Sequence, residues 1–164
     1  MDTCPDEDRK VKNERAARQC YEKLRVVQEK FAQLKPDLEG DKFWRYQRQV
    51  APALQEYIEA LSFAYYLDCD SLIPFATVQA TLQDPNGNPA SPGTLFCTKY
   101  NLPTTPLIMQ YFPLPVEDYL LGVSDLTGEL MRFAISGITQ PGGRVKAMEI
   151  CAFVRECKAG ALLL

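Results

Sequence analysis

The sequence of 164 residues contains no histidine. Histidine is a frequent general base and zinc ligand, so its absence excludes Ser-His-Asp and Cys-His catalysis and every metal site that requires an imidazole. Any acid–base or metal chemistry must therefore use the side chains of aspartate, glutamate, lysine, tyrosine or cysteine.

The sequence also lacks several features that mark zinc-binding, secreted or membrane proteins. Its six cysteines include no Cys-x-x-Cys pair, which argues against a zinc site. The charged N-terminus has no apolar signal-peptide core, so we expect reduced thiols in an intracellular protein. No apolar run approaches the roughly 18 residues needed to cross a membrane. The net charge of −3 argues against a nucleic-acid binder that relies on a general positive field.

The pattern of apolar residues predicts an all-α protein, an antiparallel bundle of long helices. Helical spacing recurs in residues 9–34, 42–67, 71–82, 115–138 and 145–158. The length and the hydrophobic content of 46% suit a single helical domain over residues 1–164. Residues 1–8 are expected to be disordered, and residues 84–114 to form a long proline-rich loop between the third and fourth helices.

Turn-forming residues predict where these helices begin and end. Pro36 and Gly40 are expected to end the first helix, and Asp41 to cap the second. Pro52 should kink or divide the second helix, and Ser71 is a candidate cap for the third. In the first helix, apolar residues at helical spacing predict a core stripe of Leu24, Val27, Phe31 and Leu34.

The clearest amphipathic segment is residues 118–132. At about 100° per residue, Asp118, Gly122, Asp125 and Glu129 lie within roughly 60° of one another, opposite an apolar side. Asp125 and Glu129 form an i,i+4 pair of like charges, which costs a few tenths of a kcal/mol in an isolated helix. A bound cation would offset that cost. The alternative is the ordinary solvated face of a surface helix.

A second acidic pair, Glu56 and Glu59, lies on the second long helix beside Phe63 and Tyr66. The alternative reading is an exposed i,i+3 pair beside aromatic residues that face a partner. Packed antiparallel, the two helices would bring four carboxylates together. Oxygen ligands without histidine favour Mg²⁺, or alternatively Mn²⁺, over zinc. Carboxylate-held magnesium with open water positions suits phosphodiester hydrolysis.

Residues 55–63 and 118–132 resemble the two signature helices of the translin-associated factor X group of the translin family, and a weaker resemblance runs from Tyr21 to Cys157. The resemblance implies an all-α fold that assembles with translin into a closed hetero-octamer around single-stranded RNA, or single-stranded DNA. It also implies a magnesium-dependent endoribonuclease, active in RNA silencing and tRNA-precursor processing, in the cytoplasm and nucleus. Its catalytic residues would be Glu56, Glu59 and Asp125, which would hold the metal together with Glu129.

The sequence departs from the family in ways that keep other functions open. The family continues past the position of Cys157 through another long helix, so we interpret the chain as a C-terminally shortened member. A non-catalytic translin-binding scaffold or nucleic-acid-binding subunit is the first alternative, and an independent helical interaction module is the second. Arg45 and Arg48 are candidate RNA contacts, although solvated surface residues would give the same pattern.

Overall fold

The computed structural model describes residues 5–82 and 113–161, and these form five helices. The helices are α1 (Pro5–Leu38), α2 (Lys42–Cys69), α3 (Phe75–Thr81), α5 (Val116–Gly137) and α6 (Gly143–Ala161). The described residues contain no strand, which confirms the all-α prediction. The predicted proline-rich loop lies outside the described residues, except for the two residues that precede Pro115.

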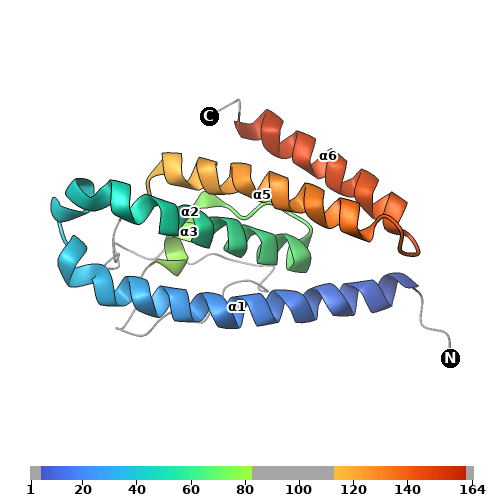
Figure 1. Cartoon of the computed structure of the whole chain (residues 1–164), viewed down its shortest axis with the longest axis horizontal. Coiled ribbons are helices and arrows are strands. Elements are labelled where there is room, and N and C mark those ends of the chain that lie inside the picture. The colour runs from blue at the N-terminus through green and yellow to red at the C-terminus, as the bar shows by residue number, and fades with distance from the viewer. Residues whose placement is uncertain (1–4, 83–112, 162–164) are drawn as a thin grey trace.

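The four long helices lie side by side, with α2 between α1 and α5 and with α6 on the far side of α5 (Figure 1). Helices α1 and α2, which follow each other in the sequence, run in opposite directions, and so do α5 and α6 (Figure 1). The acid-bearing helices α2 and α5 run in the same direction, because Gln55 contacts Asp118 while Phe63 contacts Phe133 further along. The predicted antiparallel packing of these two helices is wrong.

The short helix α3 explains this parallel arrangement. It carries the chain back along α2, where the Tyr57 hydroxyl donates to Thr81 Oγ1 at 2.8 Å. The backbone N–H of Leu114 then donates to Gln79 Oε1 at 3.0 Å, so the chain enters α5 beside α3. Helix α5 therefore begins next to the middle of α2 and not at its end.

Within residues 5–82 and 113–161, the apolar core has two parts. The larger part lies between α1, α2, α3 and the first turns of α5, and it includes Leu24, Ile58 and Val123. The smaller part joins the end of α2 to α5 and α6, where Leu126, Leu130, Ile150 and Val154 are buried with Tyr66. Phe63, Leu72 and Phe133 pack against both parts, so the core is continuous.

Several predicted helix boundaries need correction. Helix α1 begins at Pro5 and continues through Pro36 to Leu38, before Gly40 adopts a positive φ of 64° that favours glycine. Pro52 does not divide α2, which runs unbroken from Lys42 to Cys69. Helix α3 begins at Phe75, later than predicted, because Pro74 adopts an extended conformation at the N-cap. Asp41 is the N-cap residue of α2, but its side chain makes no capping hydrogen bond.

The predicted core stripe of α1 is only partly right. Leu24 and Phe31 are buried, whereas Val27 and Leu34 are 37% and 42% exposed. Gln28 is buried instead, at 1% exposure. Its amide nitrogen donates to the Tyr57 hydroxyl at 2.9 Å and to the Thr81 carbonyl at 3.2 Å. These bonds satisfy the amide nitrogen, which would otherwise be costly to bury, whereas the Oε1 atom of Gln28 has no hydrogen-bond partner among the described residues.

The structure also bears on two other predictions, which are that the cysteines are reduced and that no segment crosses a membrane. Cys20, Cys151 and Cys157 are in the thiol form, whereas Cys4 and Cys97 lie outside the described residues. None of the described helices combines the length and the hydropathy that a membrane span requires.

Candidate functional site

A glycine contact holds α2 and α5 close together. A Cβ atom added to Gly122 would lie 2.8 Å from the Cβ and Cγ2 atoms of Ile58 and 3.0 Å from the Gln55 carbonyl oxygen. Such distances are too short for an ordinary side chain, so only glycine allows the two backbones to approach in this way. The contact fixes which turns of α2 and α5 lie side by side, and with them the level of the two acidic pairs along the helices.

Asp118 also belongs to this helix contact and not to an exposed acidic face. It is 3% exposed, and its Oδ1 atom accepts a hydrogen bond from Gln55 Nε2 at 2.6 Å. Among the described residues, its Oδ2 atom has no donor. The sequence places Asp118 and Gly122 opposite the apolar side of the helix, and both are buried because α2 covers that side as well.

The four remaining acids lie around the junction of α2 and α5. Glu56 and Asp125 are exposed, whereas Glu59 and Glu129 are partly buried. The pKa of Glu59 is raised from its ordinary value of 4.5, first by burial and then by the negative charges of Glu56, Glu129 and Asp125. Arg132 opposes this effect and lowers the pKa. The negative charges of both pairs therefore act at one carboxyl group.

Although their charges act on Glu59, the four acids are not arranged as the ligands of a metal ion. Arg132 donates from Nη2 to Glu129 Oε1 at 2.8 Å, so Glu129 already has a cationic partner. Across residues 5–82 and 113–161, no three histidine, cysteine or acidic side chains are placed so that they could hold one metal ion. The catalytic and metal-binding roles of Glu56, Glu59, Asp125 and Glu129 stay predictions.

An aromatic pair borders the acids. Phe63 follows Glu59 by four residues and Phe133 follows Glu129 by four, so each lies about one helical turn beyond an acid. Their ring centroids are 5.7 Å apart, with an edge-to-face angle of 88°. Apolar rings one turn from a carboxylate reduce its solvation, which is consistent with the burial that raises the pKa of Glu59.

The two candidate RNA contacts lie further along α2. Arg45 and Arg48 are both exposed. Each precedes one of the glutamates by eleven residues, which places it about 16 Å away along the axis and within roughly 20° of the same helix face. The arginines are therefore separate from the acids but face the same side of α2. Their contact with RNA stays a prediction.

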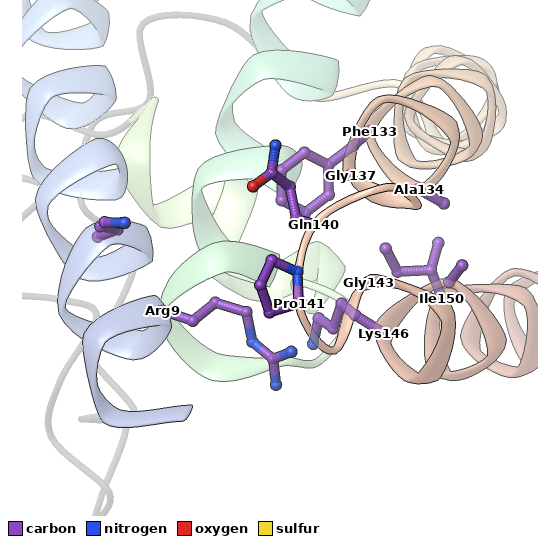
Figure 2. A pocket seen from close by; sticks show the side chains of 11 residues that line it. Arg9, Phe133, Ala134, Gly137, Gln140, Pro141, Gly143, Lys146 and Ile150 are labelled. Carbon is purple, nitrogen blue, oxygen red and sulfur yellow. The ribbon is translucent and has the colours of Figure 1, made fainter. Parts of the chain in front are cut away.

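A pocket that the sequence did not predict lies between the start of α1 and the turn that joins α5 to α6 (Figure 2). Its volume is about 430 Å³, and Arg9, Lys12 and Lys146 line it together with Phe133 and Ile150. Two features of the sequence lie at this pocket, namely the basic run of residues 9–12 and the Pro-Gly-Gly turn of residues 141–143. Neither feature shows by itself that the two segments meet.

Comparison with known proteins gives consistent results. The sequence profile of the Translin family matches residues 2–164. Translin-associated protein X of Rattus norvegicus is 33% identical over 146 residues, which cover 84% of this chain and 47% of the relative. The protein of the same name from Pongo abelii is 32% identical over 146 residues, with the same coverage of both chains.

Translin of Gallus gallus is similar at a lower level, with 25% identity over 139 residues, 85% of this chain and 52% of the relative. The chain spans about half the length of the curated relatives it matches. No solved structure matches it. The profile covers nearly all of the sequence and the resemblance of the two acidic helices agrees with it, so the chain belongs to the translin family.

Proposed function

We propose that the chain is the magnesium-dependent endoribonuclease subunit of a hetero-oligomer with translin, and that it cleaves single-stranded RNA. The observation that carries the proposal is that the parallel packing of α2 and α5 brings the two acidic pairs to the same level along the helices. The raised pKa of Glu59 agrees with this placement. The similar proteins from rat and orangutan are named for their association with translin, which supports the proposed partner. Roles in RNA silencing and tRNA-precursor processing, in the cytoplasm and nucleus, belong to the same proposal.

The donor set suits a hard cation. Glu56, Glu59, Asp125 and Glu129 offer only carboxylate oxygens, which Mg²⁺ or Mn²⁺ prefers. These side chains would have to turn towards one another to hold the ion, and Glu129 would have to leave Arg132. When bound, the metal would supply an activated water and positive charge beside the scissile phosphate.

The residues around the metal position have chemical roles of their own in this proposal. Glu59 has a raised pKa, which brings its carboxylate closer to the range where it can accept a proton from water at neutral pH. Arg132, released from Glu129, could neutralise charge on the phosphate. The edge-to-face rings of Phe63 and Phe133 would exclude bulk water from one side.

Cleavage of a fluorescent single-stranded RNA tests the proposal. The chain would be co-expressed with a translin partner and assayed with Mg²⁺, with EDTA, and as the variant Asp125→Asn. We expect internal cleavage that needs Mg²⁺ and falls at least about a hundredfold in the variant. Asp37→Asn, which changes an exposed acid at the end of α1, is the matched control and should cleave normally. Cleavage that survives both EDTA and Asp125→Asn would contradict the proposal.

A non-catalytic translin-binding subunit is the second candidate. It is favoured by one observation, which is that the described acidic side chains are not gathered as metal ligands. In that case, a soluble complex with translin would form and bind RNA but would not cleave it at any Mg²⁺ concentration. Gel filtration of the co-expressed proteins, followed by the same cleavage assay, separates the two functions.

A further inference from the structure

Asp118 is a buried acid in the first turn of α5, and it joins this helix to α2 shortly before the acidic pairs. It is 3% exposed, and its Oδ1 atom accepts a hydrogen bond from Gln55 Nε2 at 2.6 Å. Gln55 directly precedes Glu56 and lies about one turn before Glu59. Because a short hydrogen bond to a carboxylate is strong and directional, it restricts how the first turn of α5 can lie against α2.

The two carboxylate oxygens of Asp118 have different surroundings. Oδ1 is bonded to Gln55, whereas Oδ2 has no donor within residues 5–82 and 113–161. An asparagine can therefore replace this aspartate with little loss, because its amide oxygen would still accept the bond from Gln55. A leucine has nearly the same shape but offers no acceptor. The two substitutions remove the same charge and differ in whether the bond to Gln55 can form.

The backbone contact between α2 and α5 shows where the acids lie relative to this bond. A Cβ atom on Gly122 would lie 3.0 Å from the Gln55 carbonyl oxygen and 2.8 Å from two side-chain atoms of Ile58, so Gly122 is level with the turn of α2 between these residues. The two helices run parallel, and each residue advances either helix by about 1.5 Å. Three residues further along α5, Asp125 is therefore level with the next turn of α2, which carries Glu59.

The glycine contact alone does not prevent α5 from rotating about its axis. Gly122 lets the two backbones approach, but a contact between apolar atoms is not directional. Side chains end roughly 5–6 Å from the axis of a helix, so a rotation of about 20° moves a carboxylate by about 2 Å. This shift is as large as the bond of about 2.0–2.1 Å from Mg²⁺ to its oxygen ligands. A small rotation of α5 is therefore enough to withdraw Asp125 from an ion that Glu59 holds.

We propose that Asp118 is a positioning residue for the proposed cation site and that it acts through Gln55. The hydrogen bond between them holds α5 in the rotation at which Asp125 and Glu59 can bind the same ion. Asp118 is not a ligand itself, because it is buried and lies two turns, or about 10 Å, before Asp125. This inference rests on the proposed function for the ion, and on the hydrogen bond for the role of Asp118.

Mn²⁺ binding by the full chain tests this role, with the electron paramagnetic resonance of the free ion as the readout. Asp118→Asn should bind Mn²⁺ nearly as the wild type does, because Gln55 keeps its acceptor. Asp118→Leu and Gln55→Leu should each weaken binding about tenfold, which is typical for the loss of a residue that orients a metal ligand. The difference between Asp118→Asn and Asp118→Leu cannot come from charge, which is the same in both.

A double variant separates positioning from stability. Gln55→Leu/Asp118→Leu replaces both partners with apolar groups and leaves no polar atom of the pair unsatisfied, so it keeps the fold more readily than either single leucine variant. If Asp118 only stabilised the fold, the double variant would bind Mn²⁺ as the wild type does. We expect it to bind as weakly as Asp118→Leu, because apolar side chains do not fix the rotation of α5.

Matched controls come from the same two helices. Glu117→Leu removes an exposed acid from the first turn of α5, and Gln49→Leu changes an exposed glutamine of α2. Both should bind Mn²⁺ as the wild type does. Circular dichroism would show that each variant keeps its helical content.

Folded Asp118→Leu and Gln55→Leu variants that bind Mn²⁺ as tightly as Asp118→Asn would overturn the inference. They would leave the proposed function in place if the wild-type complex with translin cleaves RNA. Mn²⁺ binding that depends on the pair as predicted, without RNA cleavage by that complex, would support the inference and contradict the proposed nuclease.

If the wild type binds no Mn²⁺, the proposed function fails, and the pKa of Glu59 then tests the placement of α5 by itself. Carbon-13 NMR of the glutamate carboxyl groups in EDTA measures that pKa without a metal. The negative charges of Glu129 and Asp125 contribute to raising it, so a value that is lower in Asp118→Leu than in Asp118→Asn would support the inference. Equal values in the two folded variants would overturn it.

Discussion

At the scale of single residues, Gly122 sets how closely α2 and α5 approach. Its missing side chain leaves room for the Cβ and Cγ2 atoms of Ile58, which lie 2.8 Å from where a Cβ would be. Alanine would add helix propensity worth up to about 1 kcal/mol, but it would force two backbones apart. We predict that Gly122→Ala lowers the free energy of unfolding by about 1–3 kcal/mol, measured by urea denaturation.

Gly128 in the same helix is the control for that substitution. A Cβ atom there would meet no atom within 4 Å, and the residue is exposed. Gly128→Ala should therefore raise the free energy of unfolding by about 0.5–1 kcal/mol through helix propensity alone. If both substitutions stabilise the chain, the contact between Gly122 and Ile58 is not as tight as described.

The raised pKa of Glu59 predicts how stability depends on pH. Burial, followed by the charges of Glu56, Glu129 and Asp125, raises this pKa above 4.5, so the folded chain keeps the proton to a higher pH than the unfolded chain. Below 4.5 the residue is protonated in both states. As the pH rises through 4.5 and then through the folded pKa, stability is lost, and the loss is complete above the folded value.

Glu59→Gln should remove this loss. Urea midpoints measured at about pH 4 and about pH 7 should differ less in the variant than in the wild type, and the variant should be the more stable at neutral pH. Glu14→Gln, at an exposed position of α1, should behave as the wild type does. An unchanged pH dependence in Glu59→Gln would show that neither burial nor the neighbouring negative charges raise the pKa of this residue.

Residue types and spacing predicted the candidate acids, but not their surroundings. Asp118 shares a helix side with Asp125 and Glu129, yet it is buried against Gln55 while Asp125 is exposed. The arithmetic of 100° per residue places side chains around one helix. It does not show where a second helix covers that side, so Asp118 and Gly122 could not be assigned to a contact.

At the scale of helices, a polar network joins α1, α2 and α3. Gln28 donates to the Tyr57 hydroxyl, which donates to Thr81 Oγ1, which in turn donates to the Val78 carbonyl. The apolar pattern of α1 predicted Val27 and Leu34 in the core because it counts only apolar residues. A buried glutamine enters the stripe when partners from other helices bind its amide nitrogen, and those partners lie 29 and 53 residues away.

Tyr57→Phe tests this network. The substitution removes the central hydroxyl while Gln28 keeps its bond to the Thr81 carbonyl and Thr81 keeps its bond to Val78. We predict a loss of about 1 kcal/mol in the free energy of unfolding. Tyr46→Phe, at a position of α2 that is 45% exposed, should change it by less than about 0.5 kcal/mol. Equal effects at the two positions would mean that the network does not stabilise the helix contacts.

At the scale of the whole molecule, the direction of α5 determines which acids meet. Glu59 lies at the level of Asp125 and Glu129 because α5 starts near Gln55 and runs parallel to α2. Helical periodicity predicted the long helices and the two acidic pairs, since these are properties of local sequence. It could not predict the parallel packing, which depends on α3 and on the bond between Leu114 and Gln79.

The central claim is that Glu56, Glu59, Asp125 and Glu129 act together as one cation site. The most direct measurement is Mn²⁺ binding, followed by the electron paramagnetic resonance of the free ion and by competition with Mg²⁺. We predict that the wild-type chain binds Mn²⁺, that Mg²⁺ displaces it, and that Glu59→Gln/Asp125→Asn weakens binding at least about tenfold because ligands are lost. Glu14→Gln/Asp37→Asn, with the same change in charge at exposed positions of α1, should bind normally. Equal Mn²⁺ binding by the folded Glu59→Gln/Asp125→Asn variant, or none by the wild type, would contradict the claim.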